Sequence, residues 1–321
     1  MSITCVAYQN GIKLAEAPIE QVGNYLQKPG CFVWVSLSDA TDAELDFMQE
    51  RFGLHDLVVE DARHGYQRPK IEEYDEALFV AMHMVAVANA GLDIGEVCIY
   101  AERNFVLSLR SRSRQHFSTV RERCEREPEL LQIGTGFVLY ALMDAVVDSY
   151  FPVIDYLESE LEIIEEHLFD KGKALSNIER LYELKRKVLV LKHAVAPMME
   201  AVGKLHGGRV PPVCTEAQEY FRDIHDHLTR INSGIDTMRD TISTAIMVCQ
   251  STVTIEQNEV NKKLAAWAAI FAMATVFTGV WGMNFQRMPE LQWEYGYLAA
   301  LLVIAGVCGF IYRHFKRSGW L

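Results

Sequence analysis

The stretch LAAWAAIFAMATVFTGVW, residues 264–281, carries no charged side chain, and neither does YGYLAALLVIAGVCGFIY, residues 295–312. As an α-helix, each run of eighteen residues would be about 27 Å long, close to the thickness of the hydrocarbon core of a bilayer. A buried hairpin in a soluble protein is the alternative, but two charge-free runs of this length rarely lie side by side in a soluble domain. We therefore predict two transmembrane helices near the end of the chain.

The charges that flank these runs predict their orientation. Lys262 and Lys263 precede the first run, whereas Arg313, Lys316 and Arg317 follow the second. The connection between the runs holds one arginine against two glutamates. By the positive-inside rule, both termini face the cytoplasm and the protein is a multi-pass protein of the cell (inner) membrane. Amphipathic rings stand near the predicted boundaries, at Trp281, Trp293, Tyr295, Tyr297, Tyr312 and Trp320.

The overall composition excludes several classes of protein. The 321 residues have a net charge of −12, and the part before the first run holds 27 Lys and Arg against 41 Asp and Glu. This balance argues against nucleic-acid binding, which needs a basic face. The seven cysteines are scattered without a CxxC pair, which argues against a disulfide framework or a zinc knuckle. No P-loop and no nucleophile–base set is found, so we predict neither an enzyme nor an ATP-driven pump.

The first 136 residues mix strand and helix patterns, and residues 1–136 are predicted to form an α/β domain on the cytoplasmic side. Residues 32–39 (FVWVSLSD) predict a buried strand, and Asp42–Gly53 a helix. The apolar segment Ala77–Val87 is predicted to be extended. Two apolar runs within residues 98–111 predict a hairpin.

The pattern then becomes entirely helical, and a cytoplasmic helical segment is predicted over residues 137–214. Phe137–Phe169 is apolar and acidic at helical spacing, with a kink expected at Pro152. A capping box over residues 176–179 predicts the start of a second helix, which ends at Gly207.

A second capping box, residues 215–218, is expected to start a very long helix. Apolar residues then recur every three or four positions, and no proline occurs until Pro289. This pattern predicts one helix of about 65 residues and about 100 Å that continues into the membrane. Because such a helix is not stable alone, it needs neighbouring helices or other subunits. The predicted parts are a cytoplasmic stalk (215–263), a first transmembrane helix (264–284), an extracytoplasmic loop (285–294), a second transmembrane helix (295–312) and a basic cytoplasmic tail (313–321).

A tripeptide, Gly282-Met283-Asn284, stands at the outward end of the first transmembrane helix, and Met288-Pro289-Glu290-Leu291 follows it. In this position the two motifs resemble the signature of the CorA family of magnesium and cobalt transport proteins, which are divalent-cation channels. The resemblance extends over nearly the whole chain. It is carried by residues 34–54, 58–85, 219–227, 258–264 and 314–321.

The resemblance implies a homopentameric funnel in which five copies of the first transmembrane helix surround one pore. It implies passive uptake of Mg²⁺, with Co²⁺ and Ni²⁺ also accepted, and no organic cofactor. The expected partners are other copies of this chain, the lipid bilayer and these cations. An inside-negative membrane potential would drive a dication inward with about 4.6 kcal/mol per 100 mV, without ATP.

The chemistry of Mg²⁺ explains why a pore would use neutral groups in this motif. Mg²⁺ holds its waters tightly, so carboxylates that stripped them would bind the ion too strongly to release it. The side-chain oxygen of Asn284 and the main-chain carbonyl of Gly282 can instead accept hydrogen bonds from the hydrated ion. Met283 is expected to pack and orient the motif. Glu290, partly cancelled by Arg287, is expected to concentrate cations at the entrance.

Further pore positions follow from the resemblance alone. Asn258 matches a polar pore-lining position, Leu264 a hydrophobic constriction and Thr275 a polar position deeper in the membrane. Asn261 stands where relatives often have an apolar gate residue such as methionine, so the gate is expected to be wetter or displaced. Some relatives have a proline within 272–275, and this chain has none. Lateral packing is the alternative role for each residue.

Regulation by intracellular Mg²⁺ is also implied by the resemblance. The corresponding residues are Glu60 and Asp61, with Asp223 of an adjacent subunit. Facing carboxylates repel one another until a dication bridges them, so bound Mg²⁺ can hold the channel closed. A further acidic position of the relatives is Met247 here, so a second site there is not expected. His227, one turn from Asp223, could chelate a transition metal with it, although a solvated polar face is the favoured interpretation.

Two other functions stay open. One is a zinc transporter of the ZntB branch, although that branch has Gly-Val-Asn where this chain has Gly-Met-Asn. The other is a membrane-anchored Mg²⁺ sensor that does not conduct ions.

Overall fold

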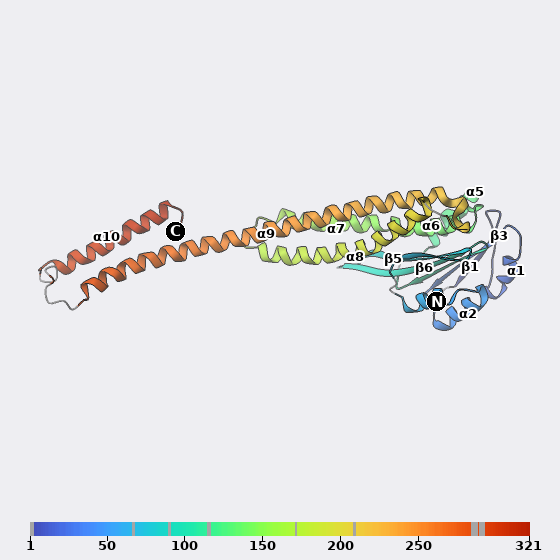
Figure 1. Cartoon of the computed structure of the whole chain (residues 1–321), viewed down its shortest axis with the longest axis horizontal. Coiled ribbons are helices and arrows are strands. Elements are labelled where there is room, and N and C mark those ends of the chain that lie inside the picture. The colour runs from blue at the N-terminus through green and yellow to red at the C-terminus, as the bar shows by residue number, and fades with distance from the viewer. Residues whose placement is uncertain are drawn as a thin grey trace. The chain divides into compact units, whose positions relative to one another are not determined.

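The computed structural model describes the chain in the ranges 3–65, 68–88, 91–113, 117–170, 172–207, 210–283 and 293–321, together with residue 288. These residues form two units, each described below by itself. The first comprises Met1–Glu166 and Glu179–Thr244, and the second comprises His167–Ile178 and Ala245–Leu321. Figure 1 shows the elements in chain order, from the blue strands to the red helices.

A sheet of seven strands forms the centre of the first unit, in the residues described. Its order from edge to edge is β2, β1, β3, β7, β6, β5 and β4. β3 pairs with β7 in parallel, and the other neighbouring pairs are antiparallel. The strands are β1 (Thr4–Gln9), β2 (Ile12–Glu16), β3 (Cys31–Ser38), β4 (Lys70–Tyr74), β5 (Ala77–Ala88), β6 (Gly91–Glu102) and β7 (Phe105–Ser111). The predicted strand, extended segment and hairpin are confirmed as β3, β5 and β6–β7.

Short helices cover one face of this sheet. They are η1 (Ile19–Gln21), α1 (Gly23–Leu26), α2 (Asp42–Phe52) and α3 (Asp56–His64). Val33 of β3, Met48 of α2 and Val58 of α3 belong to one buried apolar cluster. The predicted helix at α2 is confirmed, with a capping box at its start and Gly53 in the left-handed conformation, φ 63°, at its end.

The helices that follow the strands in the chain include those that cover the other face, as Figure 1 shows. They are α4 (Ser118–Arg126), α5 (Pro128–Leu131), α6 (Thr135–Asp148), α7 (Tyr150–Glu166), α8 (Ala174–Gly207), η2 (Pro212–Ala217) and α9 (Gln218–Trp281). α6 packs on β6 and β7, and α7 packs on β5. The buried Tyr150 donates a hydrogen bond from its hydroxyl to the carbonyl of His83, at 2.5 Å. The segment Thr135–Glu166 is long and apolar enough to cross a membrane, but 67% of its most apolar window is buried, so its hydropathy reflects packing on the sheet.

The kink expected at Pro152 is an interruption of the helix: α6 ends at Asp148, whose carbonyl would accept from the N–H that Pro152 lacks, and α7 begins at Tyr150. Two other predicted details of the helices are wrong. The capping box at 176–179 does not start α8, which begins at Ala174. The box at 215–218 lies mostly in the 3₁₀ helix η2, and α9 begins at Gln218.

The second unit contains the two apolar helices predicted to cross the membrane. α9 is 64 residues long and continues without a break into the first apolar run. α10 (Gly296–Arg317) extends five residues beyond the predicted end at Tyr312. The most apolar windows of the segments that hold α9 and α10 are only 11% and 0% buried. Their apolar side chains therefore face outward, as expected of helices surrounded by lipid.

Gly136→Ala should destabilise the first unit, because a Cβ at this position in α6 would lie 2.3 Å from the carbonyl oxygen of Val213. We expect a Tm about 4 °C lower or more, measured by circular dichroism on the full-length protein in detergent. Gly234→Ala in α9 is the matched control, because no atom lies within 4 Å of its added Cβ. It should raise the Tm by about 2 °C through helix propensity, and shifts of the same sign in both variants would contradict this packing.

Candidate functional site

The residues predicted to line an ion path occupy one broad side of α9. Leu264 and Thr275 are eleven residues apart, and Thr275 and Gly282 are seven apart. At 100° per residue, these spacings place the three within about 20° of one another around the helix axis. Asn261 and Asn258 lie about 60° and 120° further round. All five residues are exposed in one chain, and Leu264 is 63% exposed.

α10 covers a different side of α9. Ala266 is fully buried and Ile270 nearly so, and the Sγ of Cys308 in α10 lies 3.8 Å from the carbonyl oxygen of Ile270. Around the α9 axis, Ala266 and Ile270 lie about 160° and 120° from Leu264. The side that carries Leu264, Thr275 and Gly282 is therefore not covered by α10, whereas Asn261 lines a pocket with Gly172 and Leu175 of the same chain.

α9 ends directly before the tripeptide motif. The N–H of Gly282 donates to the carbonyl of Thr278 at 2.9 Å, and Met283 closes a tighter turn after it. A Cβ on Gly282 would lie 2.9 Å from the same carbonyl oxygen. A larger residue at this position would therefore shift the turn that carries the motif. Met283 is 52% exposed. Asn284 and Glu290 lie outside the described residues, so their predicted roles stay predictions.

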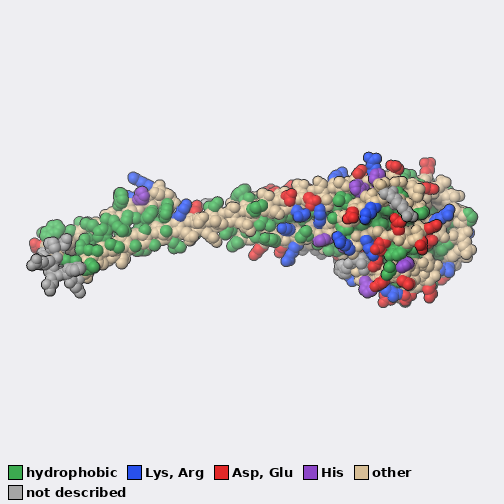
Figure 2. Space-filling model, in the orientation of Figure 1, with side chains coloured by type: hydrophobic (Ala, Val, Ile, Leu, Met, Phe, Trp, Pro, Cys, Tyr) green, Lys and Arg blue, Asp and Glu red, His purple; other side chains and the backbone are tan. Residues whose placement is uncertain are grey.

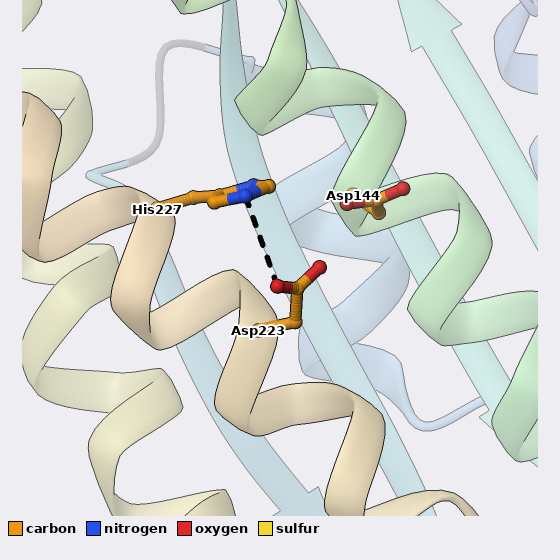
Figure 3. A group of neighbouring side chains, drawn as sticks. All are labelled: Asp144, Asp223 and His227. Atoms are coloured by element: carbon orange, nitrogen blue, oxygen red, sulfur yellow. Dashed lines mark ion pairs between the residues drawn. The ribbon is translucent and has the colours of Figure 1, made fainter.

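A separate cluster of acidic groups and a histidine lies in the first unit, between α6 and α9. Asp144 of α6 and Asp223 and His227 of α9 each offer one ligand atom, all within 4.8 Å of one another; Figure 3 shows these side chains. The Nε2 of His227 lies 3.7 Å from Asp223, and its Nδ1 lies 3.6 Å from Asp148. The buried Asp144 pairs with the Arg123 guanidinium at 2.8 Å.

The electrostatics of this cluster show an excess of negative charge. Burial raises the pKa of Asp148, and the neighbouring carboxylate of Asp144 adds to this effect. Burial and the charges of Asp144 and Asp223 also raise the pKa of Tyr140 to about 12. Both shifts have the same cause, because a partly desolvated negative charge is costly beside others.

The donor set of the cluster fits a divalent cation. Two carboxylate oxygens suit Mg²⁺, which keeps several of its waters in such sites. The imidazole nitrogen of His227 adds a ligand that suits Co²⁺ and Ni²⁺ better than Mg²⁺. The cluster is therefore a candidate metal site with a chemical preference for the transition metals.

Glu60 and Asp61, the other predicted regulatory residues, lie on the opposite layer. They belong to α3, and Val58 of this helix packs against the face of the sheet that is opposite to α6 and α9. Among the described residues, no hydrogen bond or ion pair joins them to Asp223 of the same chain. Asp61 is held by the ammonium of Lys70 at 2.7 Å, whereas Glu60 is exposed. One chain therefore does not assemble this predicted set.

The sequence analysis did not identify Asp144 and Asp148 as possible ligands. The sequence does contain a pattern that could have indicated them: in the stretch FVLYALMDAVVD, residues 137–148, they are the only charged residues. Their spacing of four places them on one face of an otherwise apolar helix. Which helix faces them could not be deduced without the topology of the sheet.

Comparisons with known proteins were made for the whole chain. Residues 30–317 match the family described as CorA-like Mg²⁺ transporter protein. The chain is 32% identical over 275 residues to the cobalt/magnesium transport protein CorA of Thermotoga maritima, with 85% of this chain and 78% of that protein covered.

Two solved structures are similar in fold. The complete structure of the CorA magnesium transporter from Methanocaldococcus jannaschii matches with a TM-score of 0.77 and 20% identity, over 100% of both chains. The ZntB cytoplasmic domain from Vibrio parahaemolyticus matches with a TM-score of 0.56 and 13% identity, over 81% of this chain and 100% of that one. The first match confirms the predicted architecture of an α/β domain, long helices and two C-terminal helices.

His227→Gln should weaken Co²⁺ binding by about tenfold or more, because it removes the only imidazole of the cluster. Binding of Mg²⁺ should change much less, because Mg²⁺ prefers oxygen ligands. Both can be measured by isothermal titration of the purified full-length protein. His225→Gln is the matched control, two residues away on the same helix and outside the cluster. Equal effects of the two variants would mean that Co²⁺ does not bind here.

Asp148→Asn should raise the Tm at pH 7.5 in the absence of divalent cations, by at most about 2 °C because Asp148 is partly exposed. A carboxylate whose pKa is raised in the folded state favours folding only below its usual pKa, and this contribution is lost as the pH rises through the raised value. The advantage of the variant should therefore disappear as the pH falls below that value. A Tm gain that is the same at pH 3.5 and pH 7.5 would exclude this charge effect.

Proposed function

The chain belongs to the family of CorA-like Mg²⁺ transporter proteins, and from this premise we propose that it forms a homopentameric channel for Mg²⁺ and Co²⁺. Hydrated Mg²⁺ enters the cytoplasm passively through this channel, driven by the membrane potential. Ni²⁺ is a further proposed substrate. The number of subunits comes from the family resemblance.

The observation that carries this proposal is the uncovered side of α9. Leu264, Thr275 and Gly282 share this side, and α10 packs elsewhere on the helix. The hydroxyl of Thr275 donates to the carbonyl of Phe271 at 2.9 Å, so its oxygen remains an acceptor for water. Further copies of α9 would cover these polar groups in a ring and form a path along their shared axis, because uncovered polar groups are costly in lipid.

The charges at the two ends of the helices support the proposed orientation. Lys262 and Lys263 precede the apolar part of α9, and α10 ends with Arg313, Lys316 and Arg317. Under the positive-inside rule both ends lie in the cytoplasm. The membrane is then crossed twice, both termini are cytoplasmic and the tripeptide motif faces outward.

The proposed filter binds the ion through its water shell. Gly282 brings its backbone close to the end of α9, and its main-chain carbonyl would act together with the side chain of Asn284. Neutral acceptors hold a hydrated dication weakly enough for rapid exit. Leu264 forms the proposed hydrophobic constriction, and Glu290 attracts cations to the outer entrance.

Closure is proposed to follow from Mg²⁺ in the cytoplasm. Asp223 lies beside Asp144 and His227, and a neighbouring subunit would add the exposed Glu60 and its neighbour Asp61. A dication between the subunits would remove the repulsion among these carboxylates and so stabilise their association. The Lys70–Asp61 ion pair makes Glu60 the more accessible of the two acids.

Gly282→Ala should reduce Mg²⁺ uptake at least tenfold, because the added Cβ meets the Thr278 carbonyl oxygen and displaces the motif. Uptake is measured in liposomes that contain a Mg²⁺-sensitive dye under an inside-negative potential. Gly306→Ala in α10 is the matched control, because no atom lies within 4 Å of its added Cβ, and it should retain uptake. Asn284→Ala should also abolish uptake.

The same assay separates the two alternative functions. Uptake of Zn²⁺ without Mg²⁺ by the folded wild-type protein would indicate a ZntB-like transporter. No uptake of any dication, even without internal Mg²⁺, would indicate a sensor that does not conduct.

A further inference from the structure

An aromatic pair joins α9 to α10 in the second unit. The ring centroids of Trp267 and Tyr312 are 6.3 Å apart, and Trp267 also stacks on Phe271 at 6.0 Å. Trp267 is 47% exposed and Tyr312 is 39% exposed. The pair therefore presents ring surface to the surroundings of the hairpin, as indole and phenol groups do at the boundary of a bilayer.

Two lysines flank this pair from different helices. α9 and α10 are antiparallel, because Cys308 contacts Ile270 whereas the later Tyr312 contacts the earlier Trp267. Lys263 lies one turn before Trp267, and Lys316 lies one turn after Tyr312, so both are on the same side of the pair. The Nζ of Lys316 lies 6.0 Å from the Tyr312 ring centroid. The two lysines therefore lie one helical turn beyond the two rings, at the same level along the hairpin.

The positive charge at this place is not neutralised by the protein. Lys263 and Lys316 are exposed, and among the described residues neither forms an ion pair. Glu259, one turn before Lys263, is the nearest acidic residue along α9, and no ion pair joins the two. In Figure 2, basic side chains lie in separate places on the two arms at this end of the hairpin, and apolar surface extends beyond them. Such a combination of charge and apolar surface matches a ligand with an anionic head and an apolar body.

We propose that Lys263, Lys316, Trp267 and Tyr312 form a binding site for the headgroup of an anionic phospholipid such as phosphatidylglycerol. The two ammonium groups bind the phosphate, and the rings contact the glycerol and ester region. The acyl chains extend along the apolar surface past Phe271, which is 65% exposed. This surface favours a lipid over free phosphate, which would leave the rings and the apolar face without a role. The site requires that α9 and α10 lie in a bilayer, but it does not require that the protein conducts ions.

Native mass spectrometry of the full-length protein tests the site by counting bound lipids. The protein is released from detergent with phosphatidylglycerol and phosphatidylcholine of identical acyl chains. The wild type should prefer phosphatidylglycerol, and Lys263→Gln/Lys316→Gln should reduce this preference by about thirtyfold, since each lysine near an anionic surface contributes about fivefold. Lys263→Arg/Lys316→Arg keeps the charge and should retain the preference.

The matched control is Lys262→Gln/Arg317→Gln, which removes the same charge about 100° away on each helix. It should reduce the preference by less than about threefold. Equal losses in the two double variants would mean diffuse attraction of charge and would overturn the site. Displacement of the lipid by glycerol 3-phosphate at an equal concentration would also overturn it, because the ligand would then be a free phosphate.

Discussion

The rest of the structure depends on α9, a single helix that has to be stable in two environments. One part of it packs in a protein core, and the other part is surrounded by lipid. A helix satisfies its own backbone hydrogen bonds, so it can leave a packed core and enter hydrocarbon without exposing unpaired N–H or C=O groups. No proline interrupts α9 over its 64 residues. What changes along α9 is the exposure of its side chains. Phe221 and Ile224 in the first unit are fully buried, whereas Leu264 in the second unit is exposed.

The long helices were predictable from the sequence, but their starts were not. Length and composition determine the two apolar runs, and no partner is needed to identify them. The start of α8 was predicted wrongly because the helix already begins at Ala174, and Asn177, which stands inside the predicted box, makes a contact of its own. Its side-chain amide donates to the carbonyl of His167 at 2.8 Å, across the turn that leads into the helix. This contact joins the first turn of α8 to the turn before it, which the spacing of Ser176 and Glu179 does not show.

The candidate metal cluster could also be predicted only in part from the sequence. Asp223 and His227 are one turn apart, so their proximity follows from the sequence. Asp144 is 79 residues away from Asp223, and it joins them only because the sheet orders its strands so that α6 lies beside α9. Glu60 and Asp61 lie on α3, which packs on the other face. Residues that depend on topology, or on a second subunit, cannot be grouped by spacing along the chain.

The apolar helices α6 and α7 have a consequence for the synthesis of the protein. The most apolar window of 18 residues in their segment has a mean hydropathy of 1.6, nearly that of the corresponding windows in the segments that hold α9 and α10, at 1.7 and 1.8. Insertion machinery that responds to hydropathy alone would have little basis to distinguish the three as they leave the ribosome. All seven strands of the described sheet precede Thr135 in the chain, so the surface that buries α6 and α7 is translated before they are. Because the strands are translated first, the sheet can bind α6 and α7 before these helices could insert into a membrane.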